Sequence, residues 1–226
     1  MVFVGGAILP HGSLIFDGDS ESESSGCGER RARLPKKLAG DTQTLYDACC
    51  QTAQLIASKH PDTILLFTPH GFTLTSGSSL VYMSKYATGS ALWNECWDDI
   101  KLNVNLDYDL SEQLLKHLKS QEFEVDGLNY IHNLMPVPLR WGEVVPLWFV
   151  HKAVSSDVKY VIVSMKRPFL KDGDDEIHMD KCQRLGAIVT SFLAQLKQKV
   201  AVVISGDLSH THPTDCNMPL YLPGDK

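Results

Sequence analysis

The chain has 226 residues, a formal net charge of −6 at pH 7 and a hydrophobic content of 43%. This length fits one large domain with a substantial core, and the acidic balance gives no reason to expect a nucleic acid or an anionic membrane as a partner. No apolar run approaches the roughly 20 residues of a membrane span, and the start lacks the basic segment of a signal peptide. The six cysteines show no paired spacing, which is typical of reduced thiols. We therefore expect a cytoplasmic protein.

Three elements are predicted before residue 61. Residues 2–9 form a short apolar run, as expected for a strand that is covered on both faces. Residues 17–40 change from an acidic segment rich in Ser and Gly to a basic one, which is typical of a solvated loop insertion. A helix then begins at Asp41 or Thr42 and ends before Pro61. Its apolar stripe consists of Leu45, Cys49, Ala53 and Ile56.

The remainder of the chain alternates apolar runs with helical patterns. Residues 84–108 are aromatic and irregular, and the proline-rich passage 136–146 matches no regular element. Strands are predicted at 63–68, 79–83, 123–125, 158–165 and 200–205, and helices at 110–118 and 177–199. This alternation predicts a single α/β domain over residues 1–226, with a central, mostly parallel or mixed sheet flanked by helices.

Three of the predicted strands lead into a sharp turn that carries a histidine. His11 and His70 stand in Pro-His-Gly turns, and His210 ends the sequence Gly-Asp-Leu-Ser-His. Because the carboxyl ends of parallel strands meet at one edge of a sheet, we expect these histidines to share a pocket. Two imidazoles with one carboxylate favour non-haem Fe(II), while imidazole also suits zinc. His210 is either a third ligand or a proton-transfer group, with Asp207 as its hydrogen-bond acceptor.

Taken together, these three turns resemble the class III extradiol ring-cleavage dioxygenase family, which is named for the catalytic B subunit of protocatechuate 4,5-dioxygenase. The similarity extends over essentially the whole chain in motif order and spacing, and the Gly-Asp-Leu-Ser-His turn is its most specific part. The resemblance implies an Fe(2+) cofactor bound by His11 and His70, with His210 as the acid–base histidine. It further implies cleavage of a catechol-type aromatic diol with O2, as in aromatic compound metabolism. It leaves the oligomeric state open, a homo-oligomer included.

The chain departs from the family pattern at two places. Where several ring-cleaving members have a substrate-contacting histidine, this chain has Trp141, which we therefore expect in the substrate pocket. The family's glutamate ligand lies a few tens of residues beyond the acid–base histidine, whereas sixteen residues follow His210 here. We thus expect a C-terminally truncated catalytic domain in which Asp207 or Glu143 substitutes for the missing carboxylate. The alternatives are a non-catalytic Memo-like binding protein that keeps the metal-edge histidines, and a zinc-dependent hydrolase on the same scaffold.

Overall fold

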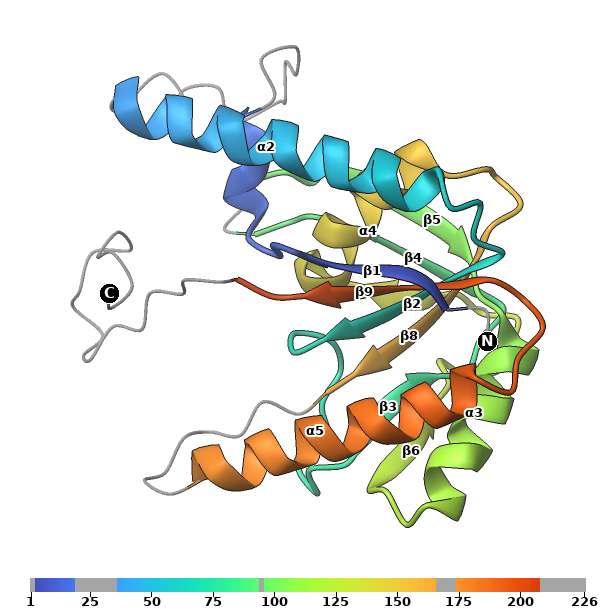
Figure 1. Ribbon diagram of the computed structural model, residues 1–226. Coiled ribbons are helices and arrows are strands. Elements are labelled where there is room, and N and C mark those ends of the chain that lie inside the picture. The colour runs from blue at the N-terminus through green and yellow to red at the C-terminus, as the bar shows by residue number, and fades with distance from the viewer. Residues whose placement is uncertain (1–2, 19–35, 94–95, 166–173, 208–226) are drawn as a thin grey trace.

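The computed structural model describes residues 3–18, 36–93, 96–165 and 174–207 (Figure 1). Within these residues, the central sheet has six strands in the order β1-β9-β2-β8-β3-β6. Neighbouring strands are parallel except for the antiparallel pair of β3 and β8. The prediction of a central mixed sheet in an α/β domain is confirmed. The strands are β1 (Phe3–Leu9), β2 (Thr63–Thr68), β3 (Ser79–Tyr82), β6 (Val125–Leu128), β8 (Lys159–Ser164) and β9 (Val200–Ser205).

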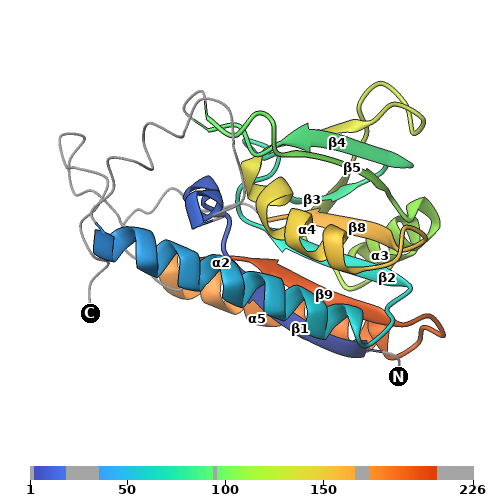
Figure 2. The same cartoon turned by 90° about the horizontal axis from the view of Figure 1, so that it is seen from above.

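Helices cover both faces of this sheet, as Figures 1 and 2 show. On one face, α2 (Lys36–Ala57) and α4 (Trp141–Ala153) pack in a hydrophobic cluster with side chains of β1, β2 and β9. On the other face, α3 (Tyr108–Ser120) and α5 (Asp174–Leu193) pack in a second cluster with the alternate residues of β2 and β8. Because β2 is covered from both sides, all six of its residues are buried, which explains its uninterrupted apolar sequence.

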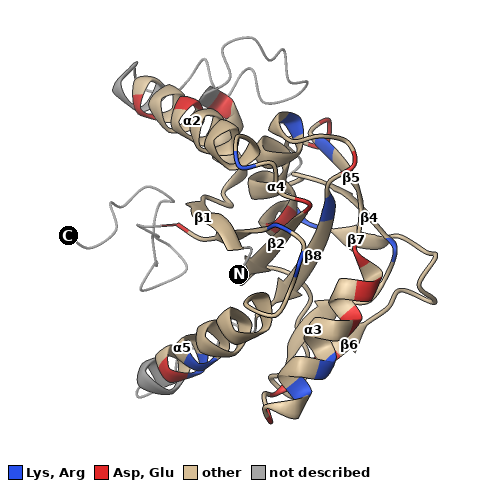
Figure 3. Ribbon diagram, turned by 45° about the vertical axis from the view of Figure 1, so that its right-hand side comes forward, with Lys and Arg blue, Asp and Glu red and all other residues tan. Residues whose placement is uncertain are grey.

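Helix α4, which follows α3 in the chain and is largely buried, was not predicted from the sequence. Eight of its residues are buried, among them Glu143 and Pro146. A helix enclosed on nearly every side has no polar face, so it lacks the 3.6-residue periodicity that identifies amphipathic helices. In contrast, the helix predicted at 110–118 is part of α3, in which Leu110, Leu114 and Leu118 are buried, and α3 carries acidic and basic residues along its length (Figure 3).

A second, smaller sheet contains β5 (Lys101–Asn105), β4 (Tyr86–Ser90) and β7 (Val137–Leu139), paired in this order. The interpretation of residues 84–108 as irregular is therefore wrong. The strands β4 and β5 form an antiparallel pair, and β5 alternates buried and exposed residues, with Leu102 and Val104 pointing inward. Asn and Lys at its exposed positions have low strand propensity, so that tertiary pairing decides this structure.

Both ends of the loop predicted at residues 17–40 are helical in the structure. Asp17 is buried in the 3-10 helix η1 (Ser13–Gly18), and the backbone from Lys36 onward is already helical in α2. Residues 19–35 of this loop lie outside the described residues. The predicted stripe of α2 is confirmed at Cys49, Ala53 and Ile56, whereas Leu45 is 48% exposed. The helix begins five residues before the predicted cap at Asp41.

Candidate functional site

The carboxyl ends of β1, β9 and β2 lie side by side at one edge of the central sheet. In the parallel pair of β1 and β9, the last residues Leu9 and Ser205 are opposite each other. The N–H of Gly206 donates to the Leu9 carbonyl at 2.9 Å, so the pairing continues just past the strand end. Each of these three strands is followed two residues later by a potential metal ligand or acid–base group: His11, Asp207 and His70.

The two histidines of the Pro-His-Gly turns are in contact. The centroids of the His11 and His70 rings are 4.3 Å apart, and the ring planes are inclined by 74°. His11 is buried, with 5% of its surface exposed, and His70 is half-buried. The structure therefore brings together the two residues that the sequence predicts as metal ligands. The predicted acid–base residue, His210, lies outside the described residues.

Asp207 lies against His11. Its Oδ2 atom is 3.0 Å from His11 Nε2, and its Oδ1 atom accepts from the His11 backbone N–H at 3.4 Å. Asp207 therefore has its two carboxylate oxygens directed at the ring and at the backbone of His11.

The other ring nitrogen of His11 faces a serine. Ser205 Oγ donates its proton to the Gly142 carbonyl at 2.7 Å and lies 3.3 Å from His11 Nδ1. Since a hydroxyl has one proton, Ser205 accepts from Nδ1, which assigns a proton to that nitrogen. With a proton on Nδ1, the His11 ring presents its Nε2 atom toward Asp207.

Trp141, the first residue of α4, packs against both histidines. Its ring centroid lies 4.4 Å from that of His70 and 5.9 Å from that of His11. The following residue, Gly142, has no room for a side chain, because a Cβ atom there would lie 2.5 Å from the Cβ of His70. The first turn of α4 is therefore pressed against the histidine edge, and Trp141 occupies the place where the sequence predicts a pocket residue.

Glu143 lies beneath the His70 turn and is fully buried. Tyr82 Oη donates to its Oε1 atom at 2.5 Å, and the Arg140 N–H donates to its Oε2 atom at 3.1 Å as part of a capping box. Burial raises the pKa of Glu143 to about 7, although these hydrogen bonds oppose the shift. Both carboxyl oxygens thus accept hydrogen bonds from the protein. Of the two carboxylates considered from the sequence, Asp207 is therefore the better placed beside the histidines.

Sequence reasoning missed the hydroxyl residues that support this edge. Thr68, Ser164 and Ser205 are the last residues of β2, β8 and β9, and all three are buried. Ser164 Oγ donates to the Phe72 carbonyl in the His70 turn at 2.7 Å. The recurrence of Ser or Thr at the end of a buried apolar run was the available signal, because a buried hydroxyl requires a hydrogen-bond partner.

No three His, Cys, Asp or Glu side chains among the described residues form a ready-made metal cluster. The contacts that the structure does contain are pairwise, between His11 and His70 and between His11 and Asp207. This donor chemistry, two imidazoles and a carboxylate, fits a divalent metal ion.

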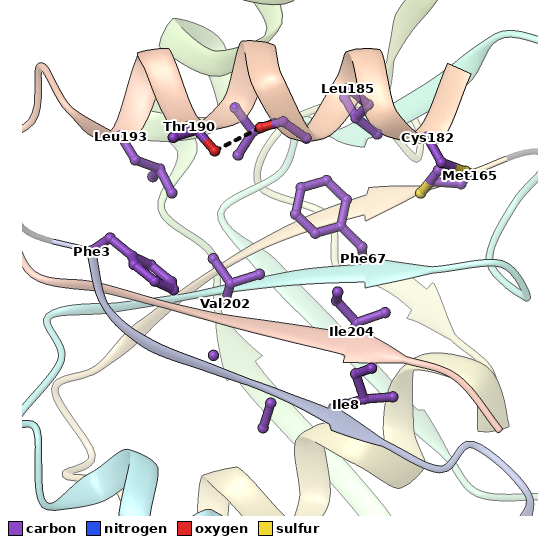
Figure 4. Close-up of a pocket in the computed structure, with 14 residues that line it drawn as sticks. Phe3, Ile8, Phe67, Met165, Cys182, Leu185, Thr190, Leu193, Val202 and Ile204 are labelled. Atoms are coloured by element: carbon purple, nitrogen blue, oxygen red, sulfur yellow. Dashed lines mark hydrogen bonds between the residues drawn. The ribbon is translucent and has the colours of Figure 1, made fainter. Parts of the chain in front are cut away.

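An apolar cavity of about 620 Å³ lies apart from this edge, between α5 and the face of β1, β9 and β2. Figure 4 shows Phe3, Phe67 and Ile204 of the sheet pointing toward Leu185 and Leu193 of the helix. Among the described residues that line this cavity there is no histidine or carboxylate. Its lining is apolar apart from Cys182 and Thr190, whereas the two contacting imidazoles and Asp207 lie at the histidine edge.

Comparison with known proteins agrees with this arrangement. The family model described as the catalytic LigB subunit of aromatic ring-opening dioxygenase matches residues 8–219. A Clostridium acetobutylicum protein, Protein CA_C1420, is 26% identical over 211 residues, which make up 90% of this chain and 38% of that protein. The chain thus spans less than half the length of this relative. Within the described residues, no helix has the length and apolar character needed to cross a membrane. The chain belongs to the family of the catalytic LigB subunit of aromatic ring-opening dioxygenases.

Proposed function

We propose that this chain is an Fe(II)-dependent extradiol dioxygenase that opens the ring of a catechol-type diol with O2. The observation that carries the proposal is the contact between the His11 and His70 rings, 4.3 Å apart, at the carboxyl edge of a chain from this family. A pair of buried or half-buried imidazoles beside a carboxylate is the donor set of the two-histidine, one-carboxylate iron sites.

The iron would be held by His11, His70 and Asp207. Bound there, Fe(II) would supply the Lewis-acid and redox chemistry toward the diol and O2. Ser205 would keep the proton of His11 on Nδ1, which would leave Nε2 to hold the metal. Asp207, whose Oδ2 lies 3.0 Å from Nε2, contributes the negative charge that a dication requires in a partly buried site.

Two other residues would act on the substrate. His210 would accept a proton from the diol and return it later, as a histidine that titrates near neutral pH can. Trp141, beside His70, would present an indole to the aromatic ring in place of a hydrogen-bonding side chain. An apolar wall at this position favours substrates whose ring carries no charged group on that side. The thiols of Cys49, Cys96 and Cys182 form no disulfide among the described residues, which supports a cytoplasmic location for this activity.

The test is anaerobic loading with Fe(II), followed by measurement of O2 uptake with a panel of catechols. The proposal requires O2 uptake that is stoichiometric with ring opening and is abolished in His11→Ala and His70→Ala. Metal binding without O2 uptake by any diol would instead favour a non-catalytic, Memo-like role. Hydrolytic activity of the zinc-loaded protein, without uptake in the iron form, would favour the hydrolase.

A further inference from the structure

Pro146 leaves a carbonyl of α4 open to donors from outside the helix. In an α-helix the N–H of each residue donates to the carbonyl four residues earlier, which for position 146 is the carbonyl of Gly142. Proline has no N–H, and its ring crowds that carbonyl. Pro146 lies inside α4, so the Gly142 oxygen lacks its usual helical donor.

Two buried hydroxyls donate to the Gly142 carbonyl instead. Ser205 Oγ, at the end of β9, donates at 2.7 Å, and Thr68 Oγ1, at the end of β2, donates at 3.2 Å. A carbonyl oxygen has two lone pairs and so accepts both bonds. The carbonyl thus links the first turn of α4 to the ends of two neighbouring strands.

Each hydroxyl then accepts from one of the two histidines. Thr68 Oγ1 accepts from the backbone N–H of His70 at 3.2 Å, and Ser205 Oγ lies 3.3 Å from His11 Nδ1. Because each hydroxyl gives its one proton to Gly142, its remaining role is that of acceptor. Through these two hydroxyls, the Gly142 carbonyl therefore fixes the backbone position of the His70 turn and the orientation of the His11 ring.

A purely structural role for the proline explains less. A proline in a helix interior weakens the helix, and the buried first turn of α4 gains no compensating bond from it within the helix. What the missing N–H allows is the pair of hydrogen bonds that the Gly142 carbonyl accepts from Thr68 of β2 and Ser205 of β9. We propose that Pro146 is a positioning residue: by keeping the Gly142 carbonyl open, it aligns His11 and His70 through Ser205 and Thr68.

This inference rests on the proposed function in one respect, the assignment of His11 and His70 as metal ligands. The test uses Pro146→Ala in the full chain, which restores an N–H that competes for Gly142. We expect Zn²⁺, used as the probe in calorimetry, to bind about 10- to 100-fold more weakly. Imidazole NMR of the metal-free protein should show the proton on Nδ1 of His11 in the wild type, and exchange or loss of that proton in the variant. The melting temperature should stay close to that of the wild type, because the helical hydrogen bond gained at Gly142 replaces a hydroxyl bond that is lost.

Further variants separate positioning from general damage. Ser205→Ala should change the His11 ring signals as Pro146→Ala does, and Thr68→Val should weaken Zn²⁺ binding while Thr68→Ser restores it. The controls are Pro61→Ala, a buried proline after α2, and Ser84→Ala, whose buried hydroxyl donates to the Met135 carbonyl at 2.6 Å. Both should leave Zn²⁺ affinity unchanged.

The outcomes distinguish this proposal from the proposed function. Unchanged His11 ring signals and unchanged Zn²⁺ affinity in Pro146→Ala overturn the positioning role, whatever the enzyme activity. A wild-type protein that binds no Zn²⁺ or Fe(II) contradicts the metal function, while the NMR comparison still decides the role of Pro146. If Pro146→Ala does not fold, Pro146→Val, which restores the same N–H with a larger side chain, decides by the same readouts.

Discussion

The central sheet has a hydrogen-bond network at the amino ends of its strands, here the amino edge, and another at their carboxyl ends, the carboxyl edge. The two networks end on different groups. At the amino edge, Thr63 Oγ1 donates to Asp107 Oδ2 at 3.4 Å, and Gln198 donates to Thr63 Oγ1 at 3.0 Å. Asp107 in turn caps α3 by accepting from the Leu110 N–H at 3.1 Å. At the carboxyl edge, the hydroxyls of Thr68 and Ser205 connect one helix carbonyl to the two histidines.

This difference shows how similar residues serve stability in one place and chemistry in another. The bonds of the amino edge end on a helix cap, which is satisfied by the protein itself. Those of the carboxyl edge end on the His11 ring, whose Nε2 faces Asp207 at 3.0 Å. Variants at the amino edge should therefore change stability, and variants at the carboxyl edge should change ligand binding and turnover.

The largest expected effect concerns His210, which the family resemblance assigns to proton transfer. His210→Ala should lower turnover by about 10²- to 10⁴-fold, because general acid–base catalysis contributes this much, while bound iron stays near the wild-type level. Iron content by metal analysis and initial rates of O2 uptake measure the two quantities. A parallel loss of iron would identify His210 as a ligand and contradict the division of roles.

His11→Ala and His70→Ala should each weaken Zn²⁺ or Fe(II) binding by about 100-fold or more, since even residues behind the ligands are worth 10- to 100-fold. Calorimetry measures the affinity. The control is His151→Gln at the opposite edge, where His151 Nδ1 lies 2.9 Å from Tyr160 Oη. Equal losses in this control would mean that the histidine edge is not the metal site.

The buried carboxyl of Glu143 should make stability depend on pH. Its folded-state pKa is raised to about 7 from 4.5, chiefly by burial, so the folded state favours the protonated form. Its contribution is fully present below about pH 4.5 and is lost as the pH rises through 7. The free energy of unfolding of Glu143→Gln, relative to wild type, should therefore rise over this window by up to about 3 kcal/mol.

Urea unfolding at pH 5, 6, 7 and 8 measures this difference. A constant offset between Glu143→Gln and wild type over the whole range would show that Glu143 ionises in the folded protein as it does in the unfolded chain. Tyr82→Phe removes the hydroxyl that donates to Glu143 and should move the transition to higher pH, because that bond favours the ionised form.

The smallest effect belongs to the amino edge. Asp107→Ala removes the cap of α3 and should lower the free energy of unfolding by about 1 kcal/mol, with an upper range near 2. Chemical denaturation measures this loss, and Zn²⁺ affinity should stay unchanged. A change in affinity as large as that of the histidine variants would show that the two edges are coupled rather than separate.

Much of the fold could be predicted from local sequence. Strands β2 and β9 have the predicted bounds, and β1 ends at the predicted residue, Leu9, because buried parallel strands are marked by short runs of β-branched and apolar residues. The meeting of His11 and His70 also followed from the sequence, since turns after neighbouring parallel strands lie at one edge. The Pro-His-Gly turns and the Gly-Asp-Leu-Ser-His turn were sufficient to predict the family.

Tertiary structure alone decided α4, the second sheet and the bonds behind the histidines. Pro146 argues locally against a helix, yet α4 continues through it because packing on the sheet and hydroxyls from β2 and β9 replace what the helix loses. The position of Asp207 beside His11 likewise depends on the register of β1 and β9, which joins residues about 200 positions apart in the chain. Such contacts leave no periodic pattern, because they are satisfied between segments rather than within one.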